Sequence, residues 1–187
     1  MATWADFKTE IKDSEGEIAH MYLDTVGAVT VGVGNMLASA AEAQKLGFVD
    51  RTTRQPATAE AIATDFDTVK KQMKGLNAVA YKVHTKLDLP AVAIDTLLDA
   101  RIDEFKAEVK GKFPKFDTYP LTVQFALLDL AFNLGTNGLV TKFPSLKKAV
   151  EAEDWAKAAT ESNRPQVSAA RNATVKKWFT DAVPPKK

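Results

Sequence analysis

The chain has no cysteine, and only two of its 187 residues are histidines, His20 and His84. Without cysteine the protein has no disulfide scaffold, zinc–thiolate site, iron–sulfur cluster or thiol nucleophile. Two histidines are also too few for a centre that needs several histidine ligands. The sequence therefore predicts no metal and no cofactor, which leaves catalysis to carboxylates and hydroxyls.

The sequence also lacks an excess of charge, because 25 Lys and Arg balance 24 Asp and Glu to a formal net charge of +1. This balance excludes a highly charged disordered chain and a strongly basic nucleic-acid binder, so we expect no nucleic acid partner. The charge is unevenly distributed, since residues 1–37 contain six acidic residues and two lysines. A basic remainder would suit a substrate that carries carboxylates, although ordinary solvated helix faces explain it equally well.

Long apolar runs are absent as well. The longest uncharged stretch, residues 25–41, contains three glycines and alternates in the manner of a β-strand. Residues 1–8 mix acidic and basic side chains and contain no apolar stretch typical of a signal peptide. We therefore expect synthesis in the cytoplasm without a signal peptide, and no insertion into a membrane.

The hydrophobic class makes up 45% of the residues, enough for one ordinary core or two small ones. The pattern predicts an amphipathic helix over 4–13 that ends before Gly16, and then a β-hairpin over 18–33 from which His20 faces solvent. Beyond residue 37 nearly everything reads as helix. The expected helices span 38–46, 58–74, 90–112, 121–134, 145–150 and 154–160.

These elements predict an α+β fold that is predominantly α-helical. We expect one domain over residues 1–187. Within it, residues 1–57 form an N-terminal lobe with the hairpin, residues 58–180 form a helical lobe, and residues 181–187 form a flexible tail.

Three polar residues are candidates for chemistry: Glu15 where the first helix meets the hairpin, Asp24 at the hairpin turn, and Thr30 on the return strand. Two carboxylates in one cleft can hydrolyse a glycosidic bond, with one as general acid and the other acting on water or on the sugar. An acid at a helix end and an Asp in a turn are also common surface features, so spacing alone leaves both interpretations open.

The hairpin segment closely resembles the phage T4-type lysozyme family, the endolysin-like muramidases. The matching residues are Glu15-Gly16, the run Tyr-Leu-Asp-Thr-Val-Gly over 22–27, and Thr-Val-Gly-Val-Gly over 30–34. The family has a Glu–Asp–Thr triad with intervals of nine and six residues, and Glu15, Asp24 and Thr30 keep both intervals. The sequence departs from the family at Asn35, where the common residue is a histidine with a mainly structural role.

Three later segments also resemble the family: residues 124–135, residues 143–146, and Arg171 with the residues up to 179. The resemblance implies that Phe132, Asn133 and Ser145 help to line a glycan cleft, and that Arg171 pairs with Glu15. From the residues themselves, Phe132 is more simply a core side chain, and Asn133 and Ser145 could equally cap helices.

The resemblance implies a two-lobed lysozyme-like fold and a muramidase, which cleaves the β-1,4 bond between N-acetylmuramic acid and N-acetylglucosamine in peptidoglycan. Glu15 would protonate the leaving oxygen, which requires apolar surroundings that raise its pKa, while Asp24 and Thr30 would hold a water for inverting attack. The alternative is a catalytically inactive lysozyme-like module that binds glycan or protein.

A family member would be made in the cytoplasm of a bacterial host and would act on the cell wall after release or delivery. The resemblance is compatible with a phage endolysin that a holin releases, a tail lysozyme, or a secreted effector that an immunity protein inhibits. We expect bacterial peptidoglycan as the partner and a monomer.

Overall fold

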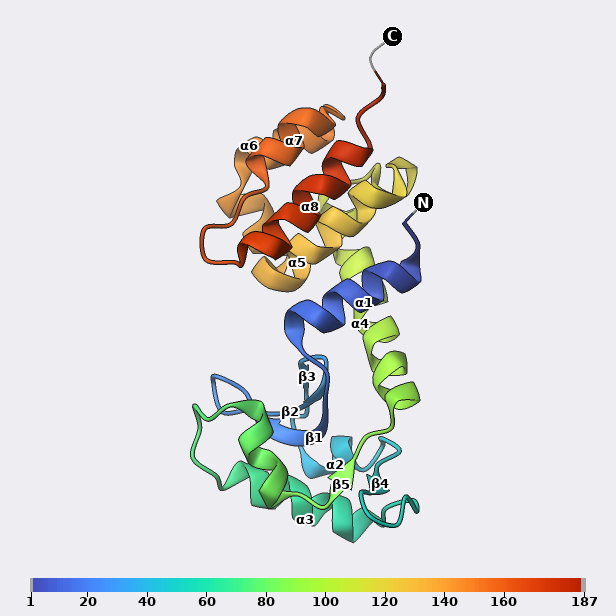
Figure 1. Ribbon diagram of the computed structural model, residues 1–187, viewed down its shortest axis with the longest axis vertical. Helices are drawn as coiled ribbons and strands as arrows, with labels where there is room; N and C mark the ends of the chain where they lie inside the picture. The colour runs from blue at the N-terminus through green and yellow to red at the C-terminus, as the bar shows by residue number, and fades with distance from the viewer. Residues whose placement is uncertain (1, 186–187) are drawn as a thin grey trace. The chain divides into compact units, whose positions relative to one another are not determined.

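The computed structural model describes residues 2–185 and has an α+β fold that is 60% helical. A small antiparallel sheet near the N-terminus is followed by a helical C-terminal region (Figure 1). The chain forms two compact units: the N-terminal unit, Thr9–Ala100, and the C-terminal unit, which comprises the described parts of Met1–Lys8 and Arg101–Lys187. The N-terminal unit extends to Ala100, whereas the sequence pattern predicts an N-terminal lobe over residues 1–57.

The N-terminal unit contains the predicted β-hairpin. Strand β1 (Ile18–Leu23) pairs antiparallel with β2 (Val29–Gly32), and the short β3 (Asn35–Met36) pairs with the other edge of β2 (Figure 1). A second pair, β4 (Val49–Asp50) with β5 (Leu87–Asp88), was not predicted. Strands of two residues are too short to show alternation in a sequence, so no local signal indicates them.

Helices pack around the strands of the N-terminal unit and enclose its hydrophobic core. They are α2 (Ala40–Ala43), α3 (Ala59–Lys70), the 3₁₀ helix η1 (Ala78–His84) and the first part of α4 (Ala91–Lys112). Thr58 caps α3, because its side-chain oxygen accepts a hydrogen bond from the Ala61 amide at 3.2 Å. The prediction that this helix reaches residue 74 is wrong. The largest fully buried side chains of this core are Met21, Phe48, Tyr81, Leu89 and Ile94.

His20 does not face solvent, which corrects the prediction from the hairpin pattern. Its side chain is 5% exposed, and its Nε2 donates a hydrogen bond to the Ala78 carbonyl oxygen at 2.9 Å. The prediction was wrong because η1 packs against β1, a contact between segments almost 60 residues apart that alternation within the hairpin does not reveal.

Burial lowers the pKa of His20 below its ordinary value of 6.5, against the opposing effect of the hydrogen bond to Ala78. The unfolded chain therefore binds the proton more tightly, and acidification through pH 6.5 favours unfolding. We expect the free energy of unfolding to fall between pH 7.5 and pH 5.5 by more in the wild type than in His20→Gln. Urea titrations at both pH values measure this difference, and parallel curves for the two proteins would contradict it.

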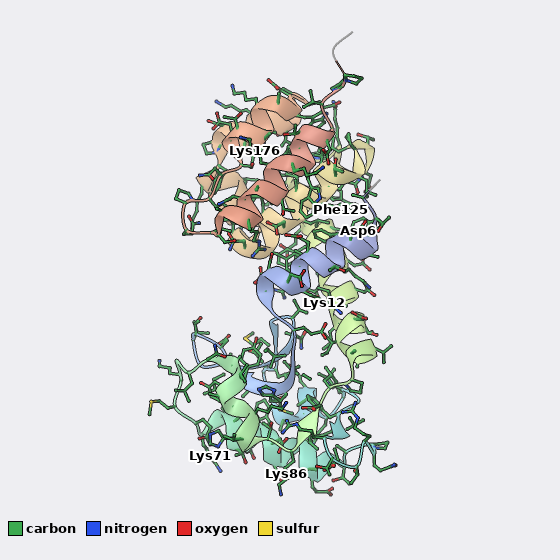
Figure 2. The ribbon with its side chains drawn as sticks, viewed as in Figure 1. Asp6, Lys12, Lys71, Lys86, Phe125 and Lys176 are labelled. Atoms are coloured by element: carbon green, nitrogen blue, oxygen red, sulfur yellow. The ribbon has the colours of Figure 1, made fainter. Side chains whose placement is uncertain are left out.

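The C-terminal unit is helical. It contains the rest of α4 and then η2 (Phe116–Thr118), α5 (Leu121–Lys142), α6 (Pro144–Glu151), α7 (Trp155–Glu161) and α8 (Ala169–Asp181). Helix α5 packs against α8, and α7 packs against both α6 and α8 (Figure 1). An aromatic cluster in the C-terminal unit centres on Phe125 of α5 (Figure 2). The centroid of the Phe125 ring lies 5.0 Å from that of Phe7, 4.8 Å from that of Trp4 and 5.9 Å from that of Trp178. The all-round apolar character of residues 121–134 predicted the burial of this part of α5.

Two predicted helix boundaries in this unit differ from the structure. Gly135 has φ 69° and ψ 154°, so it interrupts α5 where the helix was expected to end, but the chain then becomes helical again up to Lys142. Helix α6 begins at Pro144 after Phe143, so Ser145 lies inside its first turn and is not the N-cap. A proline that fixes φ at the first helical position explains this start.

Helix α8 includes Asp181, the first residue of the expected tail, and Lys186 and Lys187 lie outside the described residues. Among the described residues, no helix is both long enough and apolar enough to cross a membrane.

Candidate active site

Glu15, Asp24 and Thr30 all lie in the N-terminal unit. Glu15 is the last residue of α1 (Trp4–Glu15), and Gly16 then has φ +84° while its amide donates to the Lys12 carbonyl oxygen at 2.8 Å. This left-handed residue turns the chain out of α1 toward β1. The Lys12 side chain, labelled in Figure 2, forms ion pairs with Glu17 at 2.7 Å and Asp95 at 2.5 Å. These contacts fix the segment on both sides of Glu15.

Asp24 follows β1 and organises the hairpin turn through its own carboxylate. Its Oδ1 accepts hydrogen bonds from the amides of Val26 at 3.0 Å and Ala28 at 2.8 Å. Its backbone amide donates to the Ala28 carbonyl oxygen at 3.0 Å. Both backbone contacts of the side chain use Oδ1, which leaves Oδ2 as the oxygen that can receive a water or a sugar hydroxyl.

Thr30 lies on β2 directly opposite Tyr22 of β1. Paired residues of an antiparallel sheet place their side chains on the same face, so the Thr30 side chain shares a face of the hairpin with Tyr22. Thr30 is 2% exposed, and its Oγ1 donates to the Ala28 carbonyl oxygen at 3.2 Å. Because the Thr30 hydroxyl donates its proton to this carbonyl, its oxygen can only accept a hydrogen bond from a water.

Tyr22 lies within electrostatic reach of both carboxylates. Burial raises the pKa of its hydroxyl above 10, and the negative charges of Asp24 and Glu15 raise it further. Charges act over roughly 10 Å before salt screens them, so both carboxylates lie within electrostatic reach of one phenolic oxygen. The sequence motif included Tyr22 without giving it a role, because nothing in the local pattern indicates which side chain lies within reach of both acids.

A cavity of about 320 Å³ opens beside Asp24. It is lined by Tyr22 and residues 23–25, by Gly75 and Leu76 from the segment between α3 and η1, and by Ala78, the first residue of η1. The cavity is large enough for part of a sugar ring with its water. Asp24 is therefore both fixed by the turn and open to a small polar ligand.

Glu15 itself is exposed, unlike the buried general acid that the resemblance implies. The structure therefore differs here from the apolar surroundings that the resemblance implies for this side chain. An exposed carboxylate can still donate a proton when a bound substrate covers it and displaces water.

The four remaining candidates, Phe132, Asn133, Ser145 and Arg171, lie in the C-terminal unit. The Phe132 ring packs 4.5 Å from that of Phe105, which suits its interpretation as a core side chain. Asn133 is exposed near the end of the first part of α5, and Ser145 is exposed and lines a cavity of about 280 Å³ with residues of α6 and α7.

Arg171 belongs to a buried ion cluster that the sequence analysis missed. Asp129 of α5 accepts a hydrogen bond from Arg171 Nε at 2.8 Å on Oδ2 and one from Arg164 at 2.7 Å on Oδ1. Asp129 and Arg164 are fully buried, and Arg171 is 8% exposed. An acid inside an otherwise apolar helix was the available signal, since such a group is rarely buried unless it is paired. The expected pairing of Arg171 with Glu15 stays a prediction.

Asp65 is a second buried acid, at the edge of a cavity of about 400 Å³ in the N-terminal unit. Its Oδ2 accepts hydrogen bonds from the amides of Lys86 at 2.8 Å and Leu87 at 2.9 Å. Burial nevertheless raises the pKa of this carboxyl. These bonds join α3 to β5, so the side chain has a structural explanation.

Within residues 2–185, no group of three or more His, Asp and Glu side chains could hold a metal ion. No family model matches the chain, and no curated protein is significantly similar to it. The assignment of an activity therefore depends on the residues around Tyr22 and on the motif that contains them.

Proposed function

We propose that the protein is a peptidoglycan hydrolase of the muramidase type, which cleaves the β-1,4 bond between N-acetylmuramic acid and N-acetylglucosamine and so lyses the bacterial cell wall. The observation that carries the proposal is the position of Asp24, which the Val26 and Ala28 amides hold at the hairpin turn and which lines a cavity beside Tyr22. Tyr22 pairs with Thr30 across the hairpin, and it lies within electrostatic reach of Glu15. Two carboxylates within reach of one group are the set that glycoside hydrolysis uses.

In the proposed reaction Glu15 donates its proton to the departing glycosidic oxygen. Asp24 stays ionised and takes a proton from a water through Oδ2 while the water attacks the anomeric carbon from the opposite face. The Thr30 oxygen accepts a hydrogen bond from the same water. A single displacement of this kind inverts the anomeric configuration.

The proposal extends to the finer fold, a lysozyme-like arrangement in which the hairpin of the N-terminal unit carries the catalytic groups. The motif of intervals nine and six supports it, as does the position of all three residues on α1, the hairpin turn and β2. The roles of Phe132, Asn133, Ser145 and Arg171 toward the glycan are part of the same proposal.

The test is to incubate purified peptidoglycan with the protein and then reduce the products with borohydride. We expect new reducing ends that appear as muramitol. Asp24→Asn should lower their release by at least 100-fold while keeping the melting temperature, because the amide oxygen can still accept from Val26 and Ala28. Asp24→Ala should lose both activity and the turn contacts, which cost about 1 kcal/mol each.

Glucosaminitol as the product would contradict the muramidase assignment. If the wild type releases no reducing ends but sediments with peptidoglycan, the second candidate, an inactive binding module, replaces the enzyme. If Asp24→Asn retains full activity, Asp24 serves only the turn.

A further inference from the structure

The segment 68–87 of the N-terminal unit has an unusual composition. It contains five lysines and one histidine but no acidic residue and no arginine, in a chain whose overall charge is almost balanced. It runs from the end of α3 through η1 to the start of β5. The charge balance of the whole chain therefore conceals a strongly cationic segment on one unit.

All five lysines of this segment are exposed. Figure 2 shows two of them, Lys71 and Lys86, on the surface of the N-terminal unit. The nearest acidic residues in sequence, Asp67 and Asp88, lie just outside the segment, and Asp88 is engaged by Arg51 at 2.9 Å. In space, Asp50 and Asp65 lie within electrostatic reach of Lys86, and two acids do not balance five lysines. The segment therefore presents a positive charge at neutral pH.

Apolar side chains are exposed between these lysines. The exposed fraction is 74% for Met73, 43% for Leu76, 61% for Val79 and 84% for Val83. Isolated exposed apolar residues are common on protein surfaces, whereas a cluster of four within eleven residues is unusual and is typical of an interaction site. Tyr81, fully buried in the core, anchors η1 between Val79 and Val83 and donates to the Met73 carbonyl oxygen at 2.8 Å. The apolar side chains thus project from a segment that is held in place.

We propose that residues 70–86, here called the lysine–valine surface, dock on an anionic lipid surface. Apolar side chains enter the boundary between headgroups and acyl chains, while lysines remain at the level of the phosphates. The proposed contact is peripheral, since the segment contains only a seven-residue 3₁₀ helix.

The composition favours lipid over a protein or a nucleic acid as the occupant. Protein interfaces are enriched in arginine, tyrosine and tryptophan and depleted in lysine, whereas this surface has five lysines and no exposed aromatic ring. Single-stranded nucleic acids are commonly bound through exposed aromatic platforms, which the segment also lacks. Lysines with flexible side chains can pair with the mobile phosphates of a lipid surface, while the aliphatic side chains between them contact the acyl chains.

The lysine–valine surface reaches the candidate active site. Leu76 and Ala78 line the same cavity as Tyr22 and Asp24. Docking would therefore keep the catalytic hairpin close to a membrane surface. The inference does not depend on the proposed activity, because it concerns binding alone.

The experiment is co-sedimentation of the full chain with vesicles of phosphatidylglycerol and phosphatidylcholine, and with vesicles of phosphatidylcholine alone. We expect at least tenfold tighter binding to the anionic vesicles, weakened by 0.5 M salt. Lys71→Glu/Lys82→Glu/Lys86→Glu should lower the affinity at least tenfold, and Val79→Ser/Val83→Ser at least threefold. Neither valine is buried, so the fold should survive; circular dichroism verifies this.

The matched control reverses three exposed lysines of the C-terminal unit, Lys142→Glu/Lys157→Glu/Lys176→Glu, which changes the net charge by the same amount. Equal losses in the two triple variants would overturn the proposal, because the binding would then follow net charge alone. Equal binding to both vesicle types, or to neither, would also overturn it. Binding to polyglutamate in the absence of vesicle binding would assign the surface to an acidic protein instead.

Discussion

Glu15→Gln is expected to lower the release of reducing ends from peptidoglycan by about 10²–10⁴-fold, the usual contribution of a general acid. The amide has the size of the carboxyl group but has no acidic proton to give to the leaving oxygen. Glu15 is exposed at the C-terminal end of α1, where a negative charge does not stabilise the helix. The free energy of unfolding should therefore change by no more than about 0.5 kcal/mol.

Asp13→Asn is the matched control, because Asp13 is an exposed acid on the same helix and its replacement removes the same charge. We expect this variant to keep wild-type activity. If both variants lose activity equally, the negative charge of α1 matters in general and Glu15 has no special role. If Glu15→Gln keeps full activity with the wild-type fold, the proposed mechanism is wrong.

Asp129→Ala is expected to destabilise the protein by about 3–5 kcal/mol, the largest effect on stability that we anticipate. The substitution takes a carboxylate away from Arg164 and Arg171, which contact its two oxygens inside the C-terminal unit. Buried guanidinium groups that lose their carboxylate keep the cost of desolvation without its compensation. For a chain of this size the melting temperature should fall by about 6–20 °C.

Asp181→Ala is the control, since Asp181 also pairs with a cation, Lys177 at 2.5 Å, but on the surface of α8. Exposed pairs contribute about 0–1 kcal/mol, and an acid at a helix C-terminus is slightly unfavourable. We expect almost no change in melting temperature, measured by circular dichroism. Equal effects of the two substitutions would show that burial of Asp129 does not determine its contribution.

The α+β, mostly helical fold and the hairpin were predictable because they depend on local patterns. A period of 3.6 indicates helices, alternation indicates strands, and Gly16 marks the end of α1. Glu15, Asp24 and Thr30 could be named as candidates from the sequence because they lie within 16 residues, on one helix end and one hairpin. The boundary of the N-terminal unit at Ala100 was not predictable, because it depends on contacts between distant segments.

The sequence by itself determined the hairpin, most of the helices, the motif and the absence of cysteine chemistry, because these depend on composition or on neighbouring residues. Tertiary structure decided that Tyr22 lies within electrostatic reach of both carboxylates, that His20 is buried beneath η1, and that Asp129 binds two arginines more than 30 residues away. It also decided that Tyr81 points into the core while Val79 and Val83 remain outside. Burial depends on which segments pack together, and packing between distant segments leaves no periodic trace in the chain.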